Sequence, residues 1–139
     1  MTIPSQGLAQ LKRNEGRRPR PYQDTKGIWT VGYGTNLTTG SLSEAAMTQM
    51  LVDRLQDVET ACLSLPIWKD LSEPRQWVLL DMGYTMGFAG LMEFTEMYNA
   101  LKAGDYAGAA AALRDSKWAN EVGARADRLA KQMAEDVWV

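Results

Sequence analysis

The sequence predicts an α+β protein that is mostly α-helical, with a small β-hairpin lobe on its N-terminal side and a helical bundle after it. Two observations favour this fold class. The one hairpin-like pattern lies in YQDTKGIWTVGYG (22–34), and the rest of the chain shows apolar residues at helical spacing between Gly, Pro and capping residues. With 139 residues and 45% apolar content, we expect one globular domain over residues 1–139, with residues 16–42 as the hairpin lobe and residues 1–15 and 43–139 helical.

The first elements in the chain are a short helix and the hairpin. Ser5 is expected to cap the helix, which carries Leu8 and Leu11 three positions apart, and Gly16 is well suited to end it. Glu15 then lies at the C-terminus of this helix, where the helix dipole disfavours an ionised carboxylate. The turn sequence DTKG (24–27) joins the two strands that follow.

The remaining elements are predicted to be helices. SLSE (41–44) is a capping box that starts a long helix to about residue 63, and Pro66 follows it. Ser72, with the next two residues, opens a helix that is apolar nearly all round, is expected to be buried at the centre, and ends at Gly87 and Gly90. Four further short helices are expected over residues 91–103, 106–115, 116–122 and 125–137.

The composition excludes several classes of catalytic site. The chain has no histidine, which makes a Ser-His-Asp hydrolase, a Cys-His peptidase and a His-ligated zinc enzyme improbable. No acidic loop has calcium-binding spacing, and the single cysteine, Cys62, forms no internal disulfide. Carboxylic acids therefore remain as the candidates for acid–base chemistry, with no metal and no cofactor implied.

Charge and hydropathy limit the partners of the protein. The net charge is −2 and the isoelectric point is near 5.2, and no helix carries a continuous basic stripe, so we do not expect nucleic acid as a partner. The longest apolar stretch, residues 107–113, is too short to span a bilayer, and the first thirty residues hold no apolar signal segment. We therefore expect synthesis in the cytoplasm without a stable membrane anchor.

Three side chains around the hairpin are spaced in a way that suggests catalysis. Eight residues separate Glu15 from Asp24, and five separate Asp24 from Thr30. Taken singly, a glutamate at a helix end, an aspartate in a turn and a threonine in a strand are more often structural than catalytic. Their joint spacing is what makes them candidates.

The same residues resemble a known family. NEGRRPRPYQDTKGIWTVGYG (14–34) is similar to the active-site signature of the phage-type lysozymes, the muramidases that bacteriophages use as endolysins. The resemblance extends to DMGYTMGFAGLMEFTEMYNALKAGDYAGAAAALRDSKW (81–118) and to ARADRL (124–129), in the order of the family's helices. It implies a lysozyme-like fold of two lobes.

The resemblance also implies roles for single residues. Glu15 would be the general acid, Asp24 would stabilise the oxocarbenium-like transition state, and the Thr30 hydroxyl would hold the attacking water. Arg125 matches an arginine of the family that contacts the catalytic glutamate. Tyr84 and Asn36 match positions near the substrate cleft, and we expect them to bind substrate.

The expected reaction is hydrolysis of the β-1,4 bond between N-acetylmuramic acid and N-acetylglucosamine in peptidoglycan glycan strands. The protein would be a monomer that lyses the host after release from the cytoplasm, with export through a holin. Two alternatives stay open: a lytic transglycosylase, which needs only the acid, and a non-catalytic wall-binding or tail-associated domain. The complete set of three residues disfavours both.

The chain also departs from the family pattern. Thr35 stands where many members carry a histidine, and Asp81 stands where members typically carry an asparagine. Only residues 36–42 link the hairpin to the next helix, so the β lobe is expected to be minimal. We expect these changes to affect stability and substrate binding more than the type of reaction.

Overall fold

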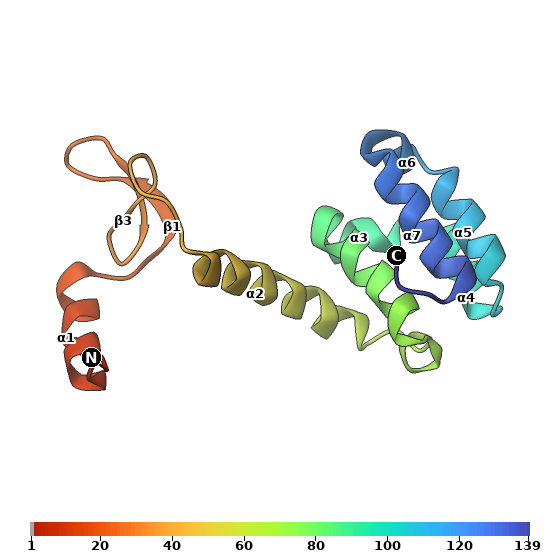
Figure 1. The fold of residues 1–139 in the computed structure, drawn as a ribbon, viewed down its shortest axis with the longest axis horizontal. Coiled ribbons are helices and arrows are strands. Elements are labelled where there is room, and N and C mark those ends of the chain that lie inside the picture. Colours follow the sequence, from red (N-terminus) through yellow and green to blue (C-terminus); the bar gives the residue numbers. More distant parts are fainter. Residues whose placement is uncertain (1) are drawn as a thin grey trace. The chain divides into compact units, whose positions relative to one another are not determined.

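A computed structural model describes residues 2–139, in which seven α-helices and one 3₁₀ helix accompany a three-stranded antiparallel sheet (Figure 1). This confirms the predicted α+β, mostly helical fold class. The chain forms two compact units, Met1–Met47 and Thr48–Val139. Helix α2 (Glu44–Cys62) begins in the first unit and continues into the second.

The first unit opens with helix α1 (Ser5–Glu15). The prediction that Ser5 caps it is wrong: Ser5 is the first helical residue, Pro4 precedes it, and no side chain caps the helix. Pro4 suits this position because the N–H that it lacks has no partner inside a helix. Gly16 ends the helix as predicted, with φ at 79° and its N–H bound to the carbonyl of Lys12.

The sheet of the first unit contains β1 (Arg18–Gln23), β2 (Trp29–Gly32) and β3 (Thr35–Asn36), in the order β1-β2-β3. Tyr22 of β1 and Asn36 of β3 both pair with Thr30, the second residue of β2. The two-residue strand β3 was not predicted, because an alternating pattern cannot be recognised in two residues. Thr30 therefore lies on the central strand.

The second unit is helical. After α2 come the 3₁₀ helix η1 (Trp68–Asp70) and helices α3 (Glu73–Met92), α4 (Thr95–Lys102), α5 (Tyr106–Arg114), α6 (Lys117–Val122) and α7 (Ala124–Glu135). Helix α7 packs against α3, α5 and α6, and α4 packs against α5 (Figure 1). The largest fully buried side chains of the core are Leu79, Met82, Leu91, Met97, Leu113, Met133, Val78 and Cys62.

Helix α3 is buried along its apolar segment, as the sequence predicted. Ser72 caps its N-terminus by accepting the N–H of Arg75, and five residues of the predicted apolar segment, 78–80 and 82–83, are buried. Val58 of α2 lies so close to Gly83 that a side chain at this position has no space. At Gly87 the backbone leaves the helical region, with φ at 76° and ψ at 165°, which is why this glycine interrupts the helix.

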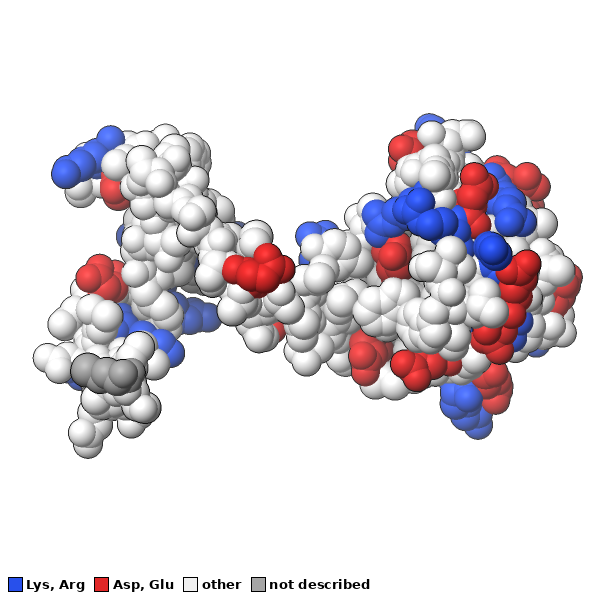
Figure 2. Space-filling model, viewed as in Figure 1, with Lys and Arg blue, Asp and Glu red and all other residues white. Residues whose placement is uncertain are grey.

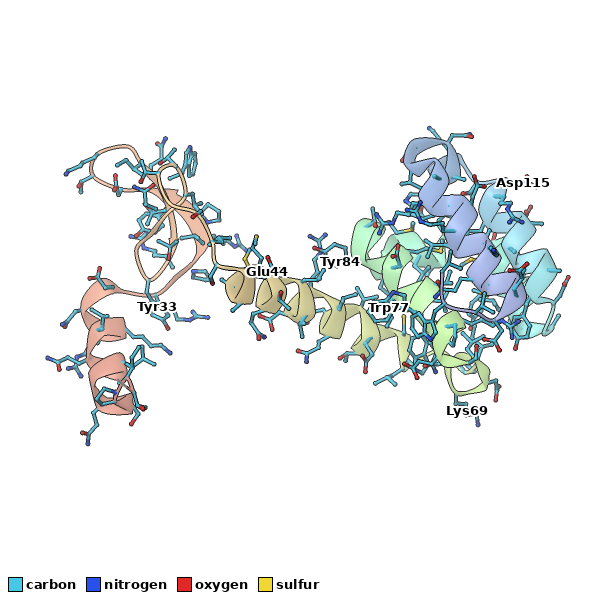
Figure 3. All side chains as sticks on the ribbon, viewed as in Figure 1. Tyr33, Glu44, Lys69, Trp77, Tyr84 and Asp115 are labelled. Atoms are coloured by element: carbon cyan, nitrogen blue, oxygen red, sulfur yellow. The ribbon has the colours of Figure 1, made fainter. Side chains whose placement is uncertain are left out.

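Arg75, near the beginning of α3, connects this helix to the end of α7 by hydrogen bonds. Its Nε and Nη2 donate to the carbonyls of Met133 and Ala134, at 2.8 and 3.3 Å. These carbonyls belong to the last turn of α7, where no helical N–H is available to them. Beside this contact, the exposed rings of Trp77 and Trp138 meet with centroids 6.0 Å apart and planes 59° apart; Figure 3 labels Trp77.

Charged side chains of both signs are interspersed over the visible face of the second unit (Figure 2). Two ion pairs, Arg114–Asp127 between α5 and α7 and Lys131–Glu135 within α7, have N···O distances of 3.9 Å and lie at the surface. Such exposed pairs contribute little to stability. Among residues 2–139, no helix is both long enough and apolar enough to cross a membrane.

Candidate functional site

Glu15 lies at the C-terminal end of α1, beside the turn that joins β2 to β3. A pocket of about 280 Å³ is lined there by Leu8, Leu11, Lys12, Glu15, Tyr33 and Gly34. The Lys12 ammonium lies 5.4 Å from the centre of the Tyr33 ring, which Figure 3 labels. A methyl group on residue 34 would approach Oε2 of Glu15 to 3.3 Å, so Gly34 leaves the space that this carboxylate uses.

Asp24 lies in the turn between β1 and β2, and its carboxylate organises that turn. Oδ1 accepts two backbone N–H groups, from Lys26 at 2.8 Å and from Ile28 at 2.9 Å. The N–H of Asp24 in turn donates to the carbonyl of Ile28 at 2.9 Å. Within residues 2–139, no hydrogen bond reaches Oδ2, so one oxygen of the carboxylate holds the turn and the other is available.

Thr30 is buried in β2, with 4% of its surface exposed. Its hydroxyl donates to the carbonyl of Ile28 at 2.9 Å, and that carbonyl also accepts the N–H of Asp24. The backbone of Ile28 therefore bonds to both candidate residues. Because the O–H of Thr30 is used as a donor, its lone pairs remain free to accept a hydrogen bond from water.

Asn36 of β3 has a structural role in the loop that leads to α2. Its Oδ1 accepts the N–H and the hydroxyl of Thr38, at 2.8 and 2.9 Å, and the N–H of Thr39 at 3.1 Å. The oxygen is therefore occupied, and the side-chain NH₂ remains as the group that could bind a ligand. Its predicted role in substrate binding stays a prediction.

Tyr84 lies on α3 and is half-buried. The guanidinium of Arg54, from α2, lies over its ring at 5.0 Å from the centroid; Figure 3 labels Tyr84. A cation over an aromatic face is an attractive arrangement. A sugar that stacks on this face would have to displace Arg54 or bind at the ring edge.

Arg125, near the start of α7, binds Asp81 of α3. Its Nε and Nη2 lie 2.9 and 2.6 Å from Oδ1 of Asp81, and Nη2 also donates to the main-chain carbonyl of Asp81 at 3.3 Å. The pair is partly buried, with side-chain exposures of 35% for Arg125 and 26% for Asp81. The predicted contact of Arg125 with Glu15 stays a prediction.

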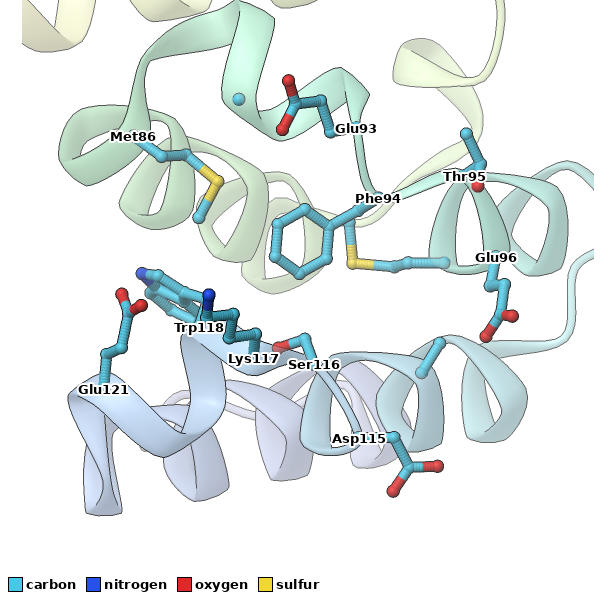
Figure 4. Close-up of a pocket in the computed structure, with 13 residues that line it drawn as sticks. Met86, Glu93, Phe94, Thr95, Glu96, Asp115, Ser116, Lys117, Trp118 and Glu121 are labelled. Carbon is cyan, nitrogen blue, oxygen red and sulfur yellow. The ribbon is translucent and has the colours of Figure 1, made fainter.

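A larger pocket of about 560 Å³ lies in the second unit, between the end of α3 and α6 (Figure 4). Its apolar wall includes Phe94 and Trp118, whose rings meet edge to face with centroids 6.4 Å apart. The buried Nε1–H of Trp118 finds no acceptor within residues 2–139. None of the residues predicted to be catalytic or substrate-binding lines this pocket.

For three residues that contact the candidate residues, the sequence did not predict this role. The glycine pattern GYG (32–34) marked a turn, but the close approach of Gly34 to Glu15 needs the folded chain. Ile28 contributes only its backbone, which no side-chain pattern reveals. Asp81 was noted as an unusual residue, and its charge was the signal that it needs a cationic partner.

Comparisons with known proteins show which family this chain resembles. A family profile described as "Phage lysozyme" matches residues 12–135. The chain is 30% identical to an endolysin of Acyrthosiphon pisum secondary endosymbiont phage 1 over 113 residues, which are 80% of this chain and 77% of that protein. It is 40% identical over 73 residues to an endolysin of Salmonella phage P22, covering 47% of this chain and 50% of that protein.

Another relative is much longer than this chain. The pre-baseplate central spike protein Gp5 of Enterobacteria phage T4 is 28% identical over 156 residues, which cover 91% of this chain and 27% of the spike protein. The chain thus spans about a quarter of that relative. Because the profile spans residues 12–135, well over half of the chain, the chain belongs to the phage lysozyme family.

Proposed function

We propose that this protein is a muramidase that hydrolyses the β-1,4 bond between N-acetylmuramic acid and N-acetylglucosamine in bacterial peptidoglycan. The observation that carries the proposal is the bonding around Ile28, which brings the Asp24 carboxylate and the Thr30 hydroxyl to one hairpin. Membership of the family supports peptidoglycan as the substrate. Glu15, beside the same hairpin at Gly34, supplies the second carboxyl group.

Each group has a distinct role in the proposed reaction. Glu15 protonates the leaving glycosidic oxygen, and water attacks the anomeric carbon from the opposite face of the sugar ring. The lone pairs of Thr30 Oγ1 accept a hydrogen bond from that water, which directs its oxygen to the carbon. Asp24 Oδ2, which holds no part of the turn, stabilises the positive charge that develops on the sugar and accepts the proton that the attacking water loses.

Digestion of purified peptidoglycan, followed by mass analysis of the new glycan ends, tests the proposal. A hydrolase leaves reducing N-acetylmuramic acid ends, each carrying the added water. A lytic transglycosylase leaves anhydro ends without it, and a wall-binding domain leaves no new ends. Anhydro ends, or the absence of new ends, would overturn the proposed reaction.

The first variant for this assay is Glu15→Gln. The amide keeps the shape of the side chain but delivers no proton, so we expect turnover to fall by about 100-fold or more. Circular dichroism and melting temperature serve as the control for folding. Turnover within about tenfold of the wild type, in a folded variant, would remove Glu15 from the role of general acid.

Two biological settings suit a muramidase of this kind. As an endolysin, it would lyse the host after leaving the cytoplasm through a holin, a setting that the endolysin relatives support. The match to the central spike protein favours a second candidate, a lysozyme carried on the phage particle. Immunoblots of purified particles and of infected-cell lysates separate the two, because only the second requires the protein to be bound to particles.

A further inference from the structure

A pair of tryptophans lies exposed on the second unit, where the segment after α7 meets the beginning of α3. Trp77, labelled in Figure 3, is 39% exposed, and Trp138 is 57% exposed. Their ring centroids are 6.0 Å apart and their planes are tilted by 59°, so the rings form an open angle rather than a closed stack. Within residues 2–139, the Nε1–H of neither ring is bound to an acceptor. The tryptophan platform, as we name these two residues, therefore presents apolar faces together with two donors.

The backbone before Trp138 is held in a defined conformation. Among residues 2–139, Asp136 is the one residue other than glycine with positive φ, at 58°, which costs conformational energy. Its N–H donates to the carbonyl of Gln132 at 3.1 Å, and its carboxylate accepts the hydroxyl of Ser72. Nη1 of Arg75 lies 3.6 Å from the other oxygen of this carboxylate. These contacts fix the chain two residues before Trp138, and they set the position from which its ring reaches α3.

Arg75 makes the base of the tryptophan platform rigid. Its guanidinium lies 3.6 Å from the centre of the Tyr106 ring on α5, and its side chain is only 14% exposed. It also holds the last turn of α7 through the carbonyls of Met133 and Ala134. A surface that is already ordered loses little conformational freedom when a ligand binds. The platform is therefore preorganised for binding.

The area of the tryptophan platform limits what can bind to it. Because a tryptophan side chain presents up to about 250 Å², the exposed parts of the two rings offer roughly 240 Å². Even with the exposed Val137 and Val139 beside Trp138, this is well below the about 800 Å² that each partner contributes to a stable protein interface. The platform is thus too small for a folded protein, and it has the size of one or two sugar rings.

We propose that the tryptophan platform is a second glycan-binding site of this protein, on which sugar rings of peptidoglycan strands stack. The flat C–H face of a pyranose covers an indole face, and the acetamido and hydroxyl oxygens at its edge accept the Nε1–H groups. The identity of the glycan rests on the proposed function. None of the candidate catalytic residues belongs to the platform, so it holds the polymer without taking part in bond cleavage. A strand held there gains a second point of attachment.

The indole signals in ¹⁵N NMR spectra test the platform in the wild-type protein. The probe is the β-1,4-linked tetramer of N-acetylglucosamine, which contains no N-acetylmuramic acid and therefore none of the bonds that the proposed muramidase cleaves. We expect the Nε1–H signals of Trp77 and Trp138 to shift during titration with the tetramer. The signal of Trp68, which is 9% exposed, should stay in place as an internal control.

Variants at position 138 separate ring stacking from a general hydrophobic contact. Trp138→Leu keeps an apolar side chain without an aromatic face, and it should raise the Kd for the tetramer, followed at the Trp77 signal, by about three- to tenfold. Trp138→Tyr keeps an aromatic face and should restore most of the affinity. Leu63→Ala is the matched control, because it removes an apolar side chain that is 60% exposed on the same unit, and it should leave the Kd unchanged. Melting temperatures check that each variant is folded.

Each outcome decides for or against the glycan site. Absence of a shift at Trp77 and Trp138, or equal Kd values for Trp138→Leu and the wild type, would overturn it. Shifts that grow with protein concentration in the absence of sugar would assign the surface to a second copy of the chain and overturn it as well. A shift with the tetramer, in a protein that releases no new ends from peptidoglycan, would defeat the proposed reaction and support the glycan site. New ends without a shift would do the reverse.

Discussion

At the scale of single residues, one backbone joins the two groups proposed to act on water. Ile28 accepts the hydroxyl of Thr30 and donates to the carboxylate of Asp24. Each side chain therefore has a structural bond as well as an assigned catalytic role. Substitutions must separate these two contributions, because loss of a turn bond alone can lower activity by unfolding the hairpin.

A double-mutant cycle makes that separation. Thr30→Val removes the hydroxyl at nearly constant volume, and Asp24→Asn removes charge but keeps the oxygen that holds the turn. If both groups act on one water, the double variant should lose less activity than the product of the two single losses. Initial rates and melting temperatures of the three variants measure this.

The outcome for purely structural residues would be different. Activity would then follow melting temperature, and the two losses would multiply because the effects are independent. Single variants with full activity would remove both residues from the mechanism. Asp24→Ala is the companion variant that removes the turn bond, and its melting temperature shows how much of any loss is due to folding.

A second residue-scale prediction concerns the glycines of the β2–β3 turn. Gly32 and Gly34 both have positive φ, at 72° and 85°, so alanine strains the backbone at either position. Only at position 34 would the added methyl group approach the Glu15 carboxylate, at 3.3 Å. We expect similar losses of melting temperature for Gly32→Ala and Gly34→Ala, and a clearly larger loss of kcat for Gly34→Ala. Equal kcat values would show that Gly34 serves the backbone alone.

At the scale of secondary structure, the sequence predicted most elements because their ends carry local signals. Gly16 and Gly87 mark helix boundaries through their backbone preferences and Ser72 through its capping hydroxyl, and the structure places boundaries or breaks there. The boundary at the start of α4 was less accurate, since helix was expected from residue 91 and α4 begins at Thr95. Phe94, which precedes α4, gives no capping signal.

The sequence predicted the candidate site only in part, because some of its contacts join residues that are far apart in the chain. Asp24 and Thr30 are close in sequence, and a hairpin brings them together by a local rule. Asp81 and Arg125 are separated by 44 residues, and their contact depends on how α7 packs against α3. Long-range contacts of this kind leave no periodic trace in one sequence. Family resemblance pointed to Arg125, but it gave no partner for this chain's own Asp81.

Helix α2 yields an element-scale prediction about pH. Cys62 is fully buried on it, and burial, with a smaller effect of Glu59, raises the pKa of the Cys62 thiol from 9.0 to about 11. The folded state therefore keeps the proton between these values while the unfolded state loses it. The contribution of the Cys62 thiol to the free energy of unfolding is therefore fully present below pH 9 and is lost as the pH rises toward 11.

Urea unfolding of the wild type and of Cys62→Ala at neutral and alkaline pH measures this effect. Lysine and tyrosine titrations are common to both proteins, so they cancel in the comparison. The wild type should lose about 1–2 kcal/mol more than Cys62→Ala between pH 7.5 and pH 10.5. Equal losses in the two proteins would mean that the thiol titrates alike in the folded and unfolded states.

At the scale of the whole molecule, the sequence predicted a single domain, and the chain forms two compact units with α2 running from one into the other. A helix that is continuous across both units links their folding, because helix formation is cooperative along the chain. We therefore propose that both units unfold together, as one thermodynamic domain.

Fluorotryptophan labelling tests this proposal. Trp29 is the tryptophan of the first unit, and the other four, Trp68, Trp77, Trp118 and Trp138, belong to the second. In a urea titration followed by ¹⁹F NMR, we expect all five signals to convert at the same denaturant concentration. A separate, earlier transition of the Trp29 signal would identify two domains that fold independently.

The tilted contact of Trp77 with Trp138 gives the second unit an intrinsic spectroscopic signal. Two indole rings 6.0 Å apart and 59° out of plane couple their electronic transitions, and this coupling vanishes when the rings separate. Trp138 lies just beyond α7, so the exciton signal in circular dichroism reports whether the chain after that helix is docked on α3. Neither tryptophan lies among the candidate site residues. Any release of this segment can therefore be followed in real time, without an attached dye, when the protein is mixed with cell walls.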